Sequence, residues 1–189
     1  MKINGRLIIF TLILIALATA CKCFFGPDPA LSGISSVIAT ALFSGMIIKE
    51  KNMSFLLPLL ALFVSDAAIQ LLYKVNLFPY EGFYSGQWKN YLILLALTLI
   101  GWGLKGKNYT TLIIGAIAAP TAYFLISNYM VWQATTEAVY PKSFGGLMMC
   151  YEAAIPFYGR SVIGTVIFLP VIIILYNYIV KRKAELTLA

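Results

Sequence analysis

The sequence predicts an all-α integral membrane protein, a six-transmembrane-helix bundle that forms one domain over residues 1–189. Of its residues, 61% are hydrophobic and only 11% are charged, whereas soluble domains carry about 25% charged residues. The apolar residues gather in runs of membrane-spanning length, and short charged or turn-forming segments separate these runs. Membrane lipid is therefore the first partner that the sequence predicts.

The expected spans cover residues 7–25, 31–48, 55–73, 90–104, 109–131 and 161–180. The second span is rich in Gly, Ala and Ser, which suits a position inside the bundle because small residues let helices approach closely. Pro58 lies early in the third span, where its missing N–H costs least. Pro120 lies in the middle of the fifth span.

Two longer connections are expected between these spans. Residues 74–89 are aromatic and polar, and they predict a loop at the membrane interface. Residues 132–157 contain a stretch that is too short and too polar to cross the bilayer. This second connection predicts an interfacial or partly re-entrant outer loop before the last helix.

The first span has a second interpretation. Its basic start, its apolar middle and the small residues before Cys21 resemble a lipoprotein signal, and cleavage there would leave five spans. Ala18 stands where such signals usually carry Leu, so the sequence favours an uncleaved span. Lys22, near the far end of that span, is expected to snorkel toward the membrane surface.

The distribution of Lys and Arg predicts the orientation. Nine of these residues fall on the side of the two termini and the tight turns, and five fall on the opposite side. Because basic residues accumulate in cytoplasmic loops, we expect both termini in the cytoplasm and the chain in the bacterial cytoplasmic (inner) membrane. The net charge of +7 is explained by this topology, and no nucleic-acid partner is expected.

Asp66 is the leading candidate for a functional residue, because an ionisable side chain within a span is costly and often marks a ligand or ion path. Gln70 lies one helical turn further on the same face. We predict a substrate-binding pocket that contains Asp66 and Gln70 and four further residues from the outer half of the spans or the outer loops: Ser36, Asn128, Trp132 and Tyr151. Two alternatives stay open, namely that Asp66 only fastens helices and that the aromatic residues form an interfacial belt.

Other chemistry is scarce in this sequence. Histidine is absent, which excludes a His-rich metal site, a haem axial His and a Ser-His-Asp triad. Cys21 and Cys23 are a weak metal motif, and they could pair with Cys150 or remain free thiols. Asp66 and Glu152 could serve as acid and base, but no partner nucleophile is visible. We therefore expect no cofactor, no metal and no enzymatic activity.

Several short motifs resemble an uncharacterised family of small bacterial six-span membrane proteins: Ala41-Leu42-Phe43-Ser44-Gly45, Pro58-Leu59-Leu60-Ala61 with Ser65-Asp66, Ser127-Asn128 with Val131-Trp132, Tyr140-Pro141-Lys142-Ser143, Cys150-Tyr151, and Ala154-Ile155-Pro156-Phe157. In size and layout this family is similar to the substrate-binding S components of energy-coupling-factor (ECF) vitamin transporters. That resemblance implies capture of a small molecule from outside, powered by a separate coupling subunit and ATPases. The alternative is a non-transporting scaffold or assembly subunit, whose polar residues only join helices.

Overall fold

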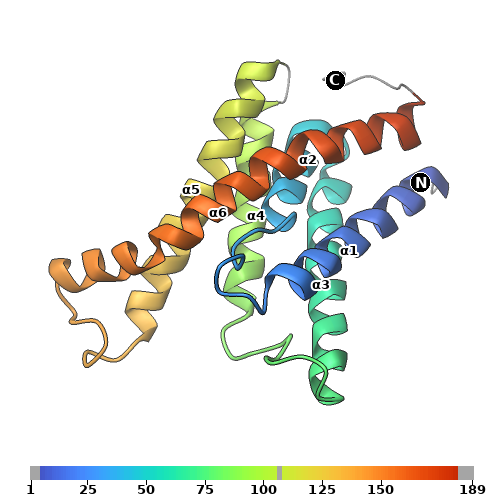
Figure 1. The fold of residues 1–189 in the computed structure, drawn as a ribbon. Coiled ribbons are helices and arrows are strands. Elements are labelled where there is room, and N and C mark those ends of the chain that lie inside the picture. The colour runs from blue at the N-terminus through green and yellow to red at the C-terminus, as the bar shows by residue number, and fades with distance from the viewer. Residues whose placement is uncertain (1–4, 106–107, 183–189) are drawn as a thin grey trace.

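The computed structural model describes residues 5–105 and 108–182, and these residues form an all-helical chain without strands (Figure 1). The elements are α1 (Gly5–Phe25), α2 (Val37–Ile47), α3 (Lys51–Lys74), α4 (Trp88–Leu104), α5 (Tyr109–Ala134), α6 (Phe144–Tyr176) and a π-helical turn, η1 (Asn177–Lys181). Four of them, α1, α3, α5 and α6 with η1, are long and apolar enough to cross a membrane. The predicted all-helical class is therefore confirmed, as is the presence of several helices long and apolar enough to span a membrane.

Helix α2 lies at the centre of the bundle and contacts α3, α4, α5 and α6. All of its residues are buried, as its small side chains predicted. It crosses α4 closely, because a Cβ added to Gly45 would lie 2.1 Å from the carbonyl oxygen of Thr98. A Cβ added to Gly101 would lie 2.6 Å from the carbonyl oxygen of Leu42. Only glycine at both positions permits this crossing.

The other helices surround this central pair. Helix α1 packs mainly on α3, and α5 packs on α6 and α4 (Figure 1). Near the end of the bundle that holds the termini, the rings of Phe10, Phe43 and Tyr176 form a cluster with centroids 5.2 to 5.5 Å apart. This cluster joins α1, α2 and α6 through apolar and edge-on ring contacts.

The second predicted span is shorter than expected. Residues 31–36 are not helical, and α2 covers only Val37–Ile47. At about 1.5 Å per residue it measures about 16 Å, well below the ~30 Å hydrocarbon core. The backbone of Gly33 has a φ of +105°, which a helix cannot contain. The sequence pattern did not show this break, because all of residues 31–48 are small or apolar until the charged turn.

The last helix is longer than expected. Helix α6 begins at Phe144, and residues 144–176 form one helix in place of the separate interfacial or re-entrant loop predicted over residues 132–157. Ser143 starts this helix, since its Oγ accepts a hydrogen bond from the backbone N–H of Gly146 at 3.2 Å. The glycine pair after Ser143 obscured that start signal in the sequence. Helix α3 also begins earlier, at Lys51, so Pro58 lies well inside it.

Candidate functional site

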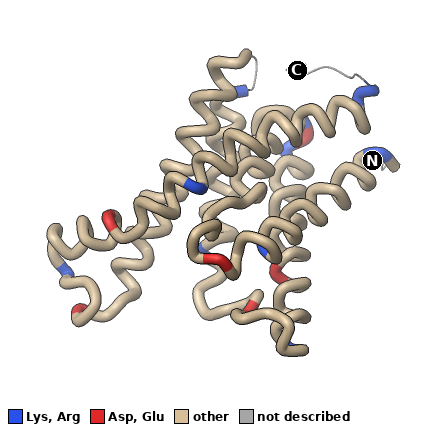
Figure 2. The backbone as a smooth tube through the Cα atoms, in the orientation of Figure 1, with Lys and Arg blue, Asp and Glu red and all other residues tan. Residues whose placement is uncertain are grey.

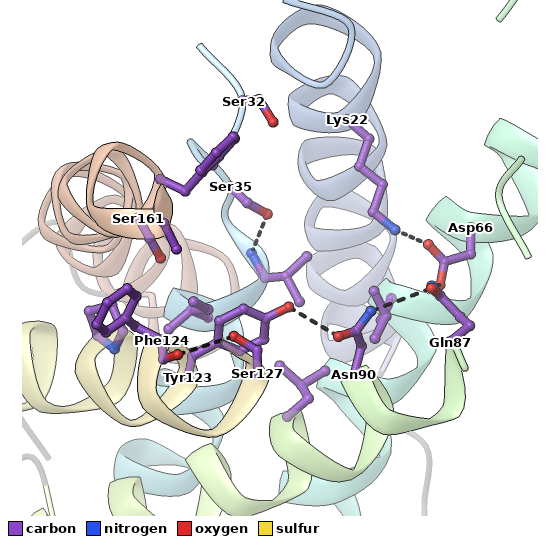
Figure 3. Close-up of a pocket in the computed structure, with 18 of the residues that line it drawn as sticks. Lys22, Ser32, Ser35, Asp66, Gln87, Asn90, Tyr123, Phe124, Ser127 and Ser161 are labelled. Atoms are coloured by element: carbon purple, nitrogen blue, oxygen red, sulfur yellow. Dashed lines mark hydrogen bonds and ion pairs between the residues drawn. The ribbon is translucent and has the colours of Figure 1, made fainter. Parts of the chain in front are cut away.

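A cavity of about 430 Å³ opens between the helices, and Figure 3 shows many of the residues that line it. Its lining comes from the end of α1, the segment 32–38, α3, the loop 80–87, α4, α5 and α6. The volume lies within the range of about 300–1,000 Å³ that is usual for small-molecule sites. The lining combines aromatic, apolar and polar side chains, which is also usual for such sites.

Asp66 lies on one wall of this cavity and is almost fully buried (3% exposed). One of its carboxylate oxygens forms an ion pair with the Nζ of Lys22 from α1. The other oxygen accepts hydrogen bonds from Gln87 Nε2 at 2.6 Å and from Tyr91 Oη at 2.8 Å. We call these four residues the Asp66 cluster. It joins α1, the loop 80–87 and α4 to α3, and each carboxylate oxygen has at least one donor within the chain.

A second hydrogen-bonded group continues from this cluster toward α5. Asn90 Nδ2 donates to the Tyr84 hydroxyl at 2.6 Å, and the hydroxyl of Tyr123 donates to Asn90 Oδ1 at 3.2 Å. Asn90 Nδ2 also lies 3.4 Å from Gln87 Oε1, and Figure 3 shows the contacts from Gln87 through Asn90 to Tyr123. The polar wall is therefore a network in which side chains mostly satisfy one another.

The loop 80–87 lies directly on α3. The backbone N–H of Phe83 donates to Gln70 Oε1 at 2.9 Å. A Cβ added to Gly82 would lie 2.0 Å from the carbonyl oxygen of Asp66, so the two backbones touch at this point. Burial raises the pKa of the Tyr84 phenol, the Asp66 charge raises it further, and the hydrogen bond from Asn90 opposes the rise. Burial also raises the pKa of Tyr80, so both phenols are neutral at pH 7.

The opposite wall, from α5 and α6, has a different character. The rings of Phe124 and Tyr158 lie 4.9 Å apart by their centroids. Asn128 Nδ2 donates to the carbonyl oxygen of Phe124 at 2.8 Å, within α5. Among the described residues, Asn128 Oδ1 and Ser161 Oγ have no hydrogen-bond partner, and both residues line the cavity. This wall therefore offers neutral polar groups beside aromatic rings.

The non-helical segment before α2 contributes Ser32, Gly33 and Ser35 to the lining. Backbone without helical hydrogen bonds is tolerated at membrane depth only where it is buried in protein or faces a polar cavity. Here the backbone carbonyl of Ser32 accepts a hydrogen bond from Arg160 Nε at 2.5 Å. The interruption of the second span thus coincides with the cavity.

Of the six residues predicted to bind substrate, the structure brings two, Asp66 and Asn128, to this cavity. Gln70 instead holds the loop 80–87 on α3. Ser36 is fully buried at the start of α2, outside the lining.

The two predicted rim residues also lie elsewhere. Trp132 Nε1 donates to the carbonyl oxygen of Pro141 at 2.9 Å, in the connection between α5 and α6. The Tyr151 hydroxyl donates to the carbonyl oxygen of Leu125 at 3.0 Å, and its ring packs on Phe124 from outside the cavity lining. Tyr151 therefore joins α6 to α5, and Trp132 joins α5 to the connection that follows it. The early start of α6 makes Tyr151 part of a helix and not of a loop, and Trp132 belongs to α5, which extends to Ala134.

Sequence reasoning missed most of the polar wall, above all Lys22. This residue was expected to snorkel to the surface, whereas it points inward and pairs with Asp66 (Figure 3). The signal was present, because two opposite charges within apolar spans predict a buried pair. Gln87 and Asn90 carried no such signal, because they lie at the start of α4, where polar residues are expected. Tyr123 lies in the middle of α5, where an uncharged tyrosine is not costly enough to stand out.

Other chemical features stay apart from the cavity. The described residues contain no cluster of His, Cys, Asp or Glu that could hold a metal ion. The three cysteines are free thiols, with Cys21 and Cys150 buried. Glu152 is exposed and does not line the cavity, so it does not meet Asp66 there.

Comparison with known proteins identifies a family for this chain. No curated protein and no solved structure matches this chain. A family model does match it over residues 1–187, which is nearly its whole length. The predicted membership of an uncharacterised family is thereby confirmed, and the chain belongs to the family of unknown function DUF6580.

Proposed function

We propose that this protein captures a small molecule in the cavity beside Asp66 and serves as the substrate-binding subunit of a micronutrient importer. The observation that supports the proposal is the coincidence of a 430 Å³ cavity with a break in the second span. Helix breaks that face a polar cavity are characteristic of membrane transport sites. The expected similarity to S components of ECF vitamin transporters points to the same role.

The proposed orientation has six crossings, with both termini in the cytoplasm of a bacterial inner membrane. The nine basic residues on one side of the sequence support it, and basic residues lie at the end of the bundle that holds the termini (Figure 2). In this arrangement the non-helical residues 31–36 and helix α2 cross the membrane together. Helix α6, at about 50 Å, exceeds the hydrocarbon core, so its first turns extend into the outer interface.

We propose no chemical reaction for this chain. Its sequence contains no Gly-rich loop followed by Lys and Ser or Thr, the motif that binds nucleotide phosphates in P-loop ATPases. Energy for transport would then come from a gradient or from a partner, and we propose a coupling subunit and ATPases of the ECF type.

One observation favours the alternative role of a membrane scaffold. Asp66, the most conspicuous polar residue of the chain, already has three donors from its own chain. A carboxylate used in this way joins helices whether or not a ligand is bound nearby. The two roles differ in one respect, because a scaffold needs no occupant in the cavity.

Native mass spectrometry of the full-length protein, purified in mild detergent, tests the proposal. We expect an adduct of small-molecule mass that is lost in Ser161→Trp, because the indole fills the cavity. Thr110→Trp is the matched control, since Thr110 is exposed and lies at the end of α5 that is far from the cavity. Equal melting temperatures of the two variants would show that the loss is local. A cavity that stays empty in protein purified from its native membrane would support the scaffold.

A further inference from the structure

We propose that the ligand of this cavity is an uncharged molecule with a flat ring, and that α5 and α6 hold it while the Asp66 cluster only joins helices. This inference rests on the proposed function, because it names the class of substrate for the same site. It differs from the simplest interpretation of Asp66, in which a buried carboxylate marks a charged ligand.

The charges that face the cavity interior cancel within the protein. Lys22 forms an ion pair with one carboxylate oxygen of Asp66, and the other oxygen accepts hydrogen bonds from Gln87 and Tyr91. The third charged residue of the lining, Glu81, is exposed. A charged ligand would lose its water without gaining a counter-charge, which is strongly unfavourable. An uncharged ligand avoids this cost.

Arg160 does not supply the missing counter-charge. Its guanidinium lies 4.8 Å from the ring centroid of Phe157, and its Nε donates to the carbonyl oxygen of Ser32. Arg160 thus ties α6 to the non-helical segment before α2, and it is outside the lining of the cavity. Its stacking and hydrogen bond are typical of a structural arginine.

The wall formed by α5 and α6 has the groups that suit an uncharged ring. Asn128 Oδ1 is an acceptor and Ser161 Oγ is both donor and acceptor, and neither has a partner among the described residues. The aromatic rings of Phe124 and Tyr158 lie on the same wall. A flat ring can pack against these aromatic faces while an amide, carbonyl or ring nitrogen at its edge meets Asn128 and Ser161.

The first test identifies what the protein carries. The full-length protein is purified in mild detergent and denatured, and the released small molecules are analysed by mass spectrometry in both ion modes. We expect a molecule that has a planar ring and no formal charge at pH 7. A released ligand that is charged at pH 7 would overturn the inference and leave the proposed function in place.

The second test uses three probes of the same shape and different charge: quinoline carboxamide, quinoline carboxylate and N-methylquinolinium carboxamide. Binding to the purified protein is measured by equilibrium dialysis. We expect the neutral amide to bind at least about ten-fold more tightly than either ion. Equal or tighter binding of an ion would overturn the inference. Absence of both a released molecule and any probe binding would overturn the proposed function as well.

Substitutions test which side chains contact the bound probe. Asn128→Ala and Ser161→Ala should each weaken binding of the neutral probe by about five-fold, the equivalent of one ordinary hydrogen bond. Thr110→Ala, at the far end of α5, should leave binding unchanged. The double variant Lys22→Gln with Asp66→Asn removes the ion pair but keeps hydrogen-bonding groups, and its affinity should stay within about two-fold of the parent. A ten-fold loss in the double variant would show that Asp66 contacts the ligand.

Discussion

Lys22 of α1 and Asp66 of α3 form a salt bridge between two apolar helices, and it is the only one between side chains of the residues described. The Lys22 side chain is 20% exposed and that of Asp66 only 5%, so the pair lies at the boundary of the cavity. Each residue alone would be a costly charge within a span, and together they offset that cost. The pair therefore fixes how α1 is rotated against α3.

Neutralising one member of this pair should lower stability. Asp66→Asn keeps the size of the side chain but leaves the Lys22 ammonium without its counter-charge. Removing one partner of a fully buried pair costs about 3–5 kcal/mol, and the partial exposure of Lys22 reduces the expected loss to about 1–3 kcal/mol. Thermal unfolding in detergent measures the change.

The double variant Lys22→Gln with Asp66→Asn provides the control for that experiment. Because it removes both charges, we expect it to recover most of the lost stability and to show a coupling free energy of about 1 kcal/mol or more. If Asp66→Asn were as stable as the parent, the ion pair would contribute nothing to the stability of the fold.

The crossing of α2 and α4 should tolerate no side chain in place of Gly45 or Gly101. Gly45→Ala and Gly101→Ala each place a methyl group against the backbone of the facing helix, so we expect a loss of about 1–3 kcal/mol or more. Gly103→Ala is the matched control, because its Cβ would meet no atom within 4 Å. It should be neutral or slightly stabilising, since alanine is the better helix former. A similar effect of all three substitutions on the melting temperature would contradict the close crossing.

The proposed orientation predicts which segments are accessible from outside. Single cysteines placed in residues 49–52 and in the C-terminal segment should resist an impermeant thiol reagent added to intact cells. Cysteines placed in residues 76–86 and 135–142 should react. Labelling is read by gel shift in a variant that lacks the three native cysteines, and both groups should react equally after the cells are permeabilised. External labelling of the C-terminal segment would refute the six-span orientation.

The mature protein should retain its first span. Phe10, Leu14 and Ala18 are fully buried, and Phe10 packs on Phe43 and Tyr176. Cleavage before Cys21 would remove all three and expose the core that they cover. We therefore expect intact-mass measurement of the purified protein to give an unlipidated chain that includes residues 1–20. A chain that begins at Cys21 with added lipid mass would establish the lipoprotein interpretation.

A variant separates these two interpretations further. Cys21→Ser abolishes the acceptor of a lipid, yet it changes only one atom of a buried side chain in an uncleaved span. Unchanged membrane yield and unchanged mass, apart from the substitution, would agree with the span. Accumulation of a longer precursor in the variant alone would agree with processing.

The sequence by itself determined the all-helical class, the approximate positions of the spanning helices and the central place of α2. These features follow from local properties, namely the hydrophobicity of each segment and the size of its side chains. The sequence also singled out Asp66 and Asn128, because polar residues within apolar runs are rare enough to be noticed.

Only the tertiary structure decided which side chains meet. The inward turn of Lys22, the contact of Gln70 with the loop 80–87 and the displacement of Trp132 and Tyr151 all depend on how each helix is rotated and where it begins. Rotation is decided by packing between distant segments, such as the close crossing at Gly45 and Gly101. Hydrophobicity along the chain contains no information about that packing, because every face of a membrane helix can be apolar.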